Sequence, residues 1–331
     1  MRLRAWLAAA CGVVVSTAPF VASPALATEY RLLMSWDQNY PGYQALILPF
    51  VKEVEDATKG SMKFKISGPE TVPSFEQLQP TGTGVFHFLF THGAYHFGTT
   101  PVATAIEAIQ TDQKTWRAAG IKEFTDKHYQ QFGVKLFGLA VSPPNIAYNI
   151  ILRQPVKPSG DLQGMKIRMS PSYEGVVRML GASPVVLPPA EVYTGLDKGL
   201  VDGAAWPSFG AYNYRWYEVA KYIMKPTFGV GTQLFFMHLP TWNKLSDDER
   251  GILMAAAEKL ENAFYVDYKR LVDEEDKLLT GKGMTITEVG AAQKDKIQDA
   301  WNQGLWDMSV KKNAKDTEAL RQFAVSKGLA K

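Results

Sequence analysis

Short apolar runs alternate with amphipathic stretches along most of the chain. The apolar, β-branched runs predict strands at residues 29–36, 62–67, 85–90, 134–140, 146–153, 165–169, 184–187 and 201–205. The amphipathic stretches predict helices at residues 41–58, 172–180 and 190–198. Because strands and helices alternate, we expect an α/β fold with two lobes and mainly parallel sheets.

A second pattern predicts one long helix. Ser246 and Glu249 have the spacing of a capping box, and after Gly251 the helical pattern continues without Pro or Gly to Thr280. At about 1.5 Å per residue such a helix is roughly 50 Å long, enough to cross both lobes. The charged tail from Gln293 predicts one or two further helices.

These elements suggest how the chain is divided. We expect residues 28–150, with about 239–280, to form lobe I, and residues 151–238, with about 281–331, to form lobe II.

The first residues have the pattern of a secretory signal peptide. Arg2 and Arg4 precede an uncharged apolar stretch at residues 5–22, and small residues follow up to Ala27. We therefore expect cleavage after Ala27 and export to the periplasm. The alternative is a lipoprotein attached through Cys11, but the apolar stretch continues past that residue.

Composition narrows the class of protein. Cys11 is the one cysteine, so a chain cleaved after Ala27 has neither disulfides nor a thiolate for catalysis or metal binding. Residues 1–27 carry two of the 36 basic side chains and none of the 33 acidic ones, so the mature chain is close to neutral. Such a balance indicates neither nucleic acid nor a membrane surface as a partner.

Arg168 is the first candidate for chemistry. Residues 165–169 alternate Met, Ile and Met with Lys166 and Arg168, which places a guanidinium on a predicted strand. A buried guanidinium needs an anion, and its planar fork suits a carboxylate. The carboxylate can belong to a bound solute or to an acidic residue of the chain, and the pattern alone does not decide between them.

Trp206 is the second candidate. It follows small residues at positions 203–205 and precedes Pro207, so an indole there could stack on a flat or apolar ligand. The alternative is an ordinary tryptophan of the core.

Three histidines raise the possibility of a metal site. His87, His92 and His96 lie close together, and the last two are four residues apart, a spacing that binds zinc on a helix. Gly93 interrupts the segment, which has the pattern of a strand end entering a loop. A histidine-based metal-binding protein therefore stays an alternative to the main hypothesis.

The sequence contains none of the common enzymatic motifs for nucleophilic serine, phosphate-binding loops, zinc hydrolysis or dinucleotides. Paired acids at residues 247–248 and 274–275 lie on the predicted long helix, where a solvated face explains them. We predict that the protein is not an enzyme. The alternative is an exported hydrolase or lyase that acts on an organic acid through a site without such a motif.

Four ordered segments carry a family resemblance: DLQGMKIR at residues 161–168, LGASP at 180–184, EVY at 191–193 and KGLVDG at 198–203. Their succession closely resembles the DctP-like solute-binding proteins of tripartite ATP-independent periplasmic (TRAP) transporters. The likeness extends over most of the chain after the predicted leader and is strongest at residues 161–207.

The resemblance implies a clamshell of two α/β lobes, joined by crossing strands and a long helix, that closes on a carboxylate-bearing solute. In that family the arginine of the Gly-x-Lys-x-Arg segment holds the carboxylate, so the role is carried over to Arg168. It also implies that the closed protein delivers its solute to membrane subunits of a TRAP transporter driven by an ion gradient.

Two departures from the family pattern change the expected pocket. Many relatives read D-G-x-E-N-P where this chain has Ala205 and Trp206, and in the oxo-acid-binding branch that acid helps to hold a metal ion. Ala205 has no ligand atom in its side chain, so we expect no metal and no cofactor. Tyr148 stands where sialic-acid-binding relatives carry a further arginine, which implies fewer charges and more aromatic surface.

Further lining residues are expected from their positions. Asn145 and Tyr148 lie on a strand leading between the lobes, Tyr95 lies in a segment that resembles a family ligand loop, and Trp36 ends the first predicted strand, where α/β pockets open. We expect a small monocarboxylate with an apolar or aromatic body stacked near Trp206, bound by a monomeric receptor.

Overall fold

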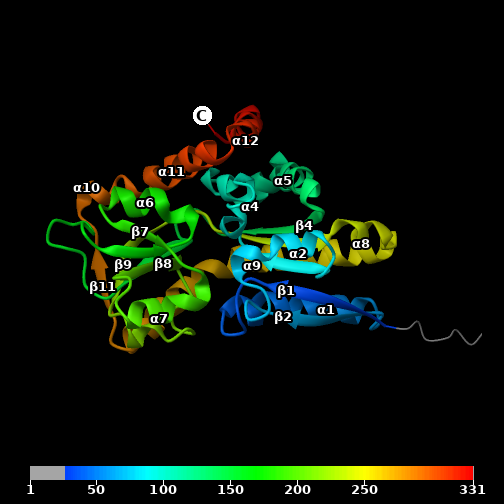
Figure 1. Ribbon diagram of the computed structural model, residues 1–331, viewed down its shortest axis with the longest axis horizontal. Helices are drawn as coiled ribbons and strands as arrows, with labels where there is room; N and C mark the ends of the chain where they lie inside the picture. Colours follow the sequence, from blue (N-terminus) through cyan, green and yellow to red (C-terminus); the bar gives the residue numbers. More distant parts are fainter. Residues whose placement is uncertain (1–26, 331) are drawn as a thin grey trace, which may run out of the picture.

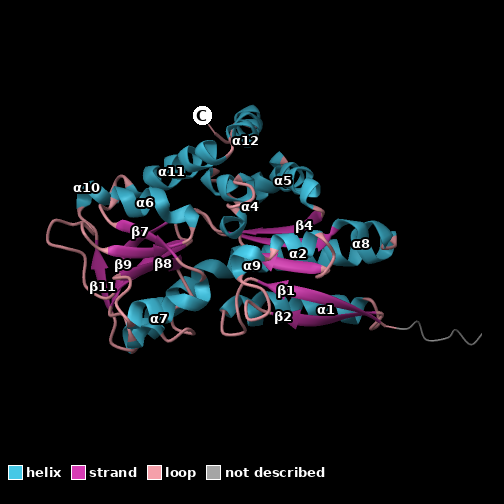
Figure 2. Ribbon diagram, viewed as in Figure 1, coloured by secondary structure: helices cyan, strands magenta, loops and turns pink. Residues whose placement is uncertain are grey.

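The computed structural model describes residues 27–330, and within this range the chain forms two α/β lobes side by side (Figure 1). The predicted signal peptide lies almost wholly outside the described residues. Each lobe is built on one β-sheet flanked by helices (Figure 2), as predicted from the alternating pattern. The sheets are mixed rather than mainly parallel, because each contains antiparallel as well as parallel pairs.

The sheet of the first lobe has the order β2-β1-β3-β10-β4. Its strands are β1 (Thr28–Met34), β2 (Met62–Ser67), β3 (Phe88–Thr91), β4 (Val134–Val141) and β10 (Thr232–His238). β1 pairs in parallel with β2 and β3, whereas β10 is antiparallel to both β3 and β4.

The sheet of the second lobe has the order β11-β9-β5-β8-β6-β7. Its strands are β5 (Tyr148–Leu152), β6 (Lys166–Met169), β7 (Ser183–Val186), β8 (Gly203–Pro207), β9 (Tyr222–Phe228) and β11 (Thr285–Glu288). β5 is antiparallel to β8 and β9, whereas β6 is parallel to β7 and β8. The chain crosses from the first lobe to the second at β5, and it returns from the second lobe to the first at β10.

Two connections carry the chain between the sheets and lie against each other. The Ser142 N–H donates to the Gly231 carbonyl at 2.9 Å, and the Ala147 N–H donates to the Gly229 carbonyl at 3.4 Å. The structure places both crossing strands differently from the predicted division of the lobes. β10, in the range expected for lobe II, pairs in the first sheet, and β5 begins in the second sheet at Tyr148.

The long helix is present as predicted. α9 (Asp247–Gly281) has 35 residues, and Ser246 and Glu249 form the expected capping box. Its first part packs on β4 and on α1 (Leu48–Ala57), while Glu275 near its other end accepts the Tyr212 N–H of the second lobe at 2.8 Å. α9 therefore braces both lobes.

The remaining helices surround the two sheets. In the first lobe they are η1 (Tyr43–Ile47), η2 (Ser74–Glu76), α2 (Leu78–Gly82), η3 (Gly93–His96), α3 (Val102–Ala105), η4 (Ile106–Ala108), α4 (Gln113–Ala119), α5 (Ile121–Tyr129), η5 (Gln130–Phe132) and α8 (Leu239–Lys244). In the second part of the chain they are η6 (Pro171–Tyr173), α6 (Glu174–Met179), η7 (Pro189–Glu191), α7 (Val192–Asp197), η8 (Trp216–Glu218), α10 (Ala291–Lys294), α11 (Ile297–Lys312) and α12 (Ala314–Ser326).

One of these helices joins the lobes a second time. α11 packs on α6 of the second lobe and also on α3 and η4 of the first, along the upper edge of the molecule in Figure 1. Over residues 27–330, none of the helices combines the length and apolar character that a membrane span requires.

Candidate ligand-binding site

A narrow cavity lies where the two sheets and α9 meet. The first lobe contributes Trp36, His92, Tyr95, Gly231 and Gln233, the second Tyr148, Arg168, Ser170, Tyr173, Trp206 and Pro207, and α9 Phe264 and Tyr268. About 20 Å³ of it is open to the centre of a water molecule, and one water requires about 10–15 Å³ on this measure. The cavity therefore has room for little more than one water molecule.

A larger hollow of about 440 Å³ lies between α6 and α11. Its walls carry mixed charges, including Glu174 and Arg178, which pair with each other at 2.7 Å. The hollow is open to solvent, where water can hydrate its charges. The interlobe cavity is the better candidate because its wall contains buried polar atoms without partners.

Arg168 lies on β6 with its side chain 1% exposed. Its Nε donates to the Leu187 carbonyl at 2.9 Å and its Nη1 to the Ala205 carbonyl at 3.2 Å. Its Nη2 has no hydrogen-bond partner within residues 27–330, and the ion pairs recorded there include no acid for this arginine. The structure therefore contradicts the alternative of an internal salt bridge.

Burial lowers the pKa of the Arg168 guanidinium, because a cation loses hydration in the interior, while Tyr95 and Tyr173 act in the opposite direction. Arginine nevertheless stays charged in proteins. The cavity thus contains a cation held by two carbonyls, with one N–H group still unmatched, which favours an anionic ligand.

Trp206 is both part of the core and part of the cavity wall. The indole is 1% exposed and lies edge-on to Tyr214 and tilted against Trp216. The Arg168 Cζ lies 5.3 Å from the centre of its ring, a cation–π distance. Trp206 is thus a tryptophan of the core that also packs against the guanidinium, and its stacking on a ligand stays a prediction.

Trp36 and Tyr95 face these residues from the first lobe. The Trp36 ring stacks on Tyr40 at 4.7 Å and lies 5.5 Å from the Tyr95 ring. Burial raises the pKa of Tyr95 to about 12, while the positive charge of Arg168 and side-chain hydrogen bonds with Trp36 and Arg168 act in the opposite direction. Tyr95 is therefore a neutral hydroxyl at physiological pH, near the arginine of the opposite lobe.

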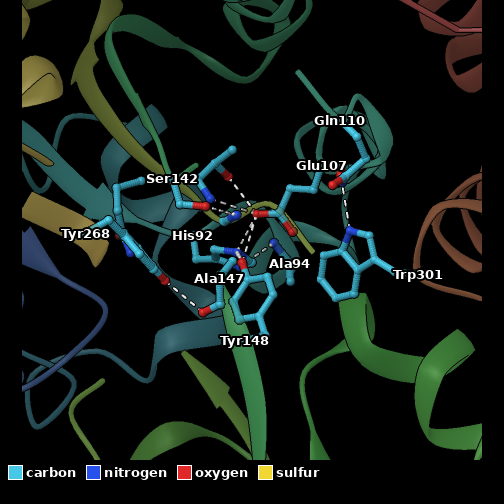
Figure 3. Close-up of polar contacts among 12 residues, drawn as sticks. His92, Ala94, Glu107, Gln110, Ser142, Ala147, Tyr148, Tyr268 and Trp301 are labelled. Carbon is cyan, nitrogen blue, oxygen red and sulfur yellow. Dashed lines mark hydrogen bonds and ion pairs between the residues drawn. The ribbon is translucent and has the colours of Figure 1, made fainter. Parts of the chain in front are cut away.

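Tyr148 and His92 both contact the buried carboxylate of Glu107, a residue that the sequence analysis did not select (Figure 3). The Ala94 N–H donates to His92 Nδ1 at 3.2 Å, so the ring hydrogen is on Nε2, which donates to Glu107 Oε1 at 2.7 Å. The Tyr148 hydroxyl donates to the same oxygen at 3.2 Å and lies 3.0 Å from His92 Nε2.

Glu107 is connected to the crossing strands and to α11 as well. Its Oε1 accepts the backbone N–H of Thr232 at 3.0 Å and the hydroxyl of Thr232 at 2.9 Å. The Trp301 indole N–H donates to the Glu107 carbonyl at 3.2 Å. A single acid within the apolar residues 102–109 is the signal that could have indicated this site, because a charge in a buried segment requires partners.

The other two histidines have separate partners. His87 Nδ1 accepts the Arg31 N–H at 2.9 Å. His96 lies near the Tyr129 hydroxyl at 3.3 Å, and burial lowers its pKa to about 3, so that the ring stays neutral. Across the described part of the chain, no three His, Cys, Asp or Glu side chains form a group suited to a metal ion.

The prediction for Asn145 requires a correction. The residue has a φ of 65° in the turn before β5, its side chain is exposed, and its carbonyl accepts the Thr227 hydroxyl at 2.9 Å. Asparagine tolerates this left-handed conformation better than most residues, so Asn145 serves the turn. It does not line the interlobe cavity.

The structure thus brings five of the six expected site residues into one cavity: Trp36, Tyr95, Tyr148, Arg168 and Trp206. The sequence analysis missed others. Phe264 and Tyr268 are four residues apart on α9 and share a face, a spacing visible in the sequence. Gln233 lies on β10, a strand that was not predicted.

The chain is similar in sequence to known periplasmic binding proteins. The chain is 27% identical over 162 residues to the 2,3-diketo-L-gulonate-binding periplasmic protein of Escherichia coli, a match that covers 48% of each chain. It therefore spans about half the length of that relative.

Solved structures share the fold. A TRAP periplasmic solute-binding protein from Desulfovibrio salexigens with bound orotic acid has a TM-score of 0.78 at 19% identity, covering 91% of this chain and 98% of that one. An extracytoplasmic solute receptor from Bordetella pertussis that binds pyroglutamic acid has a TM-score of 0.76 at 18% identity, covering 90% and 99%. The model of the bacterial extracellular solute-binding proteins, family 7, matches residues 33–313. The chain belongs to this family of bacterial extracellular solute-binding proteins.

Proposed function

We propose that the protein is a periplasmic receptor that captures a small organic carboxylate through Arg168 and delivers it to the membrane subunits of a TRAP transporter. One observation supports this above the others. The buried guanidinium is fixed by two carbonyls and an indole, yet its Nη2 has no partner among residues 27–330. A carboxylate entering between the lobes supplies the missing negative charge.

The mechanism is lobe closure. The anion site lies on β6 of the second lobe, whereas Trp36 and Tyr95 come from the first, so a solute contacts both walls only when the lobes are together. Closure also removes water from the arginine–carboxylate pair and strengthens it. Ligand contacts therefore stabilise the closed state selectively, which is the signal that membrane subunits need.

Binding without turnover is part of the proposal. His92 is the histidine of the cavity wall, and both of its ring nitrogens are engaged, Nδ1 by the Ala94 N–H and Nε2 by Glu107. It is thus not free to act as a general base. The relatives support the solute class, since their names include orotic acid, pyroglutamic acid and a diketogulonate.

A thermal-shift panel of organic acids tests the proposal. A carboxylate that binds the folded protein raises its melting temperature, and Arg168→Lys, which keeps the charge but lacks the fork, weakens the best hit by at least about tenfold. Exposed Lys166→Arg on the same strand is the matched control. An absence of any shift, or unchanged affinity in Arg168→Lys, contradicts the carboxylate receptor, and mass spectrometry of the recovered hit detects turnover.

A further inference from the structure

Two aromatic side chains meet across the lobes outside the cavity. Phe209 follows β8 of the second lobe, is 4% exposed, and stacks on Tyr40 of the first lobe with the ring centres 6.1 Å apart. It also lies edge-to-face with Tyr268 of α9, 5.1 Å between ring centres. Neither Phe209 nor Tyr40 lines the cavity, although both pack against residues that do, since Tyr40 stacks on Trp36. The two rings therefore join the lobes without facing the solute.

Two glycines make this contact possible. Gly210 has a φ of 102°, and a Cβ there would lie 3.2 Å from Pro41 Cδ of the first lobe. A Cβ on Gly42 would overlap the ring of Tyr40, which lies over that glycine. Each lobe thus has a residue without a side chain at the place where the two segments approach closely.

Polar groups beside the rings also cross between the lobes. Burial and then the negative charge of Asp37 raise the pKa of Tyr214, so a carboxylate of the first lobe lies near a hydroxyl of the second. Asp37 is held in its turn by the Asn39 N–H, which donates to Oδ1 at 2.8 Å. The Tyr212 N–H donates to Glu275 of α9 at 2.8 Å. Contacts within the protein therefore hold both of the segments that meet.

A contact that exists only when the lobes are together stabilises the closed state and not the open one. Opening exposes Phe209 to water, which is unfavourable for an aromatic ring that is buried and stacked. The observed affinity of a receptor is the affinity of its closed state multiplied by the fraction of molecules that reach that state. A side chain outside the cavity can therefore change the affinity for the solute.

We propose that Phe209 is a positioning residue for lobe closure, and that Phe209 and Tyr40 form a clasp that sets the affinity for the solute without touching it. The inference rests on the proposed receptor function. Because the clasp consists of protein groups alone, it also favours the closed state of the free protein. In the bound protein it slows dissociation, since the lobes must part before the solute leaves.

Spin labels test the clasp on the free protein. Residues 27–330 contain no cysteine, so Thr71→Cys in the first lobe and Lys198→Cys in the second, both at exposed positions, carry the labels. Double electron–electron resonance measures the distance between them. Phe209→Ala is expected to reduce the fraction of molecules at the shorter distance at least about threefold. A distribution that equals that of the labelled parent overturns the clasp.

Stopped-flow tryptophan fluorescence tests it with solute. The probes are orotate and L-pyroglutamate, the acids bound by the structural relatives. Phe209→Ala is expected to raise the dissociation rate at least about tenfold and to change the association rate less than about twofold, because encounter precedes closure. An unchanged dissociation rate overturns the clasp and leaves the receptor proposal intact. Failure of every carboxylate contradicts the receptor proposal, and the label distances still decide the clasp.

Matched variants separate closure from general stability. Phe137 on β4 is also buried, at 3% exposure, but lies in the core of the first lobe. Phe137→Ala is expected to lower the melting temperature and to leave the label distances and the dissociation rate unchanged. If it accelerates dissociation as much as Phe209→Ala, the clasp is wrong. Phe209→Leu removes the stacking but keeps an apolar side chain, and it serves if the Ala variant does not fold.

A double variant tests whether the two rings act together. Tyr40→Leu and Phe209→Leu each remove the stacked pair, so the double variant is expected to dissociate about as fast as the faster single variant. Two independent effects would multiply instead, and that result overturns the clasp.

Discussion

Arg168 and Glu107 are both charged and both buried, and the chain surrounds them in different ways. Glu107 Oε1 receives four hydrogen-bond donors from three residues, His92, Tyr148 and Thr232. Arg168 donates hydrogen bonds to two carbonyls and lies against the face of an indole. Its Nη2 has no hydrogen-bond partner in the described chain. The carboxylate does not line the cavity, whereas the guanidinium does.

The difference distinguishes a charged residue that stabilises the fold from one that is available to a ligand. Oε1 of Glu107 is compensated by groups of the protein itself, which connect η4, β5 and β10 at the point where the chain crosses between lobes. Its Oε2 has no hydrogen-bond partner among residues 27–330, but it does not line the cavity. Removal of Glu107 exposes buried donors and weakens the fold. In the proposed receptor Arg168 is left for a ligand to compensate, so its removal is expected to affect binding more than folding.

The largest effect on stability is expected at Glu107. Glu107→Ala leaves the donors of His92, Tyr148 and Thr232 buried without an acceptor, which costs about 4 kcal/mol of unfolding free energy. Urea unfolding followed by tryptophan fluorescence measures the loss. Exposed Glu123→Ala on α5 is the control. A loss below about 1 kcal/mol would show that Glu107 is not the structural centre described here.

The next prediction concerns Arg168 and is expected to affect ligand affinity rather than stability. Arg168→Met removes the cation and its desolvation cost, so the free protein is expected to keep or gain stability. Affinity for the best carboxylate is expected to fall about 150-fold, or about 3 kcal/mol, because the carboxylate loses its buried partner. Calorimetry and the melting temperature of the free protein are measured together. A free protein that loses several kcal/mol would place Arg168 in the same class as Glu107.

The two charges also differ in how well the sequence predicts them. Arg168 could be predicted because it stands on an apolar strand inside an ordered series of family-like segments, and the pattern leaves open only what its anion is. Three-dimensional pairing decides that question, since it depends on which acids approach within hydrogen-bond distance. The carboxylate of Glu107 has no such series around it. Its place in an apolar segment indicates that it needs partners, but not which residues these are.

Gln233 shows a second limit. Pro226, Gly229 and Gly231 interrupt the apolar run that contains β9 and β10, so the alternation that marks other strands is lost there. The fold class and the long helix could be predicted from patterns along the chain. The side chains that crossing strands bring from one lobe into the other could not, because periodicity carries no information about distant pairing.

Glu275 is a third buried acid, and its contribution to the stability of the fold is expected to depend on pH. It accepts the Tyr212 N–H, yet burial raises its pKa to about 7 from an ordinary 4.5. The folded state therefore holds a proton that the unfolded state releases, so this contribution to stability is complete below pH 4.5 and declines as pH rises towards the folded pKa.

The expected loss is roughly 2 kcal/mol between pH 5 and pH 7. Glu275→Gln keeps an acceptor for the Tyr212 N–H and removes the ionisation, so the difference in stability between variant and wild type grows over that range. Urea midpoints at pH 5, 6 and 7 measure it, with the exposed neighbour Glu274→Gln as control. A difference that stays constant with pH would place the pKa of Glu275 near its ordinary value.

The smallest effect is expected at Tyr148, the residue that belongs to both regions. Its ring lines the cavity, while its hydroxyl donates to Glu107 Oε1. Tyr148→Phe keeps the ring and removes one of the four donors, which costs about 1 kcal/mol of unfolding free energy. Because the hydroxyl is committed to Glu107, carboxylate affinity is expected to change less than about threefold. If affinity instead falls as far as in Arg168→Met, the hydroxyl contacts the solute directly. Tyr148 would then contribute to ligand binding as well as to the hydrogen bonds around Glu107.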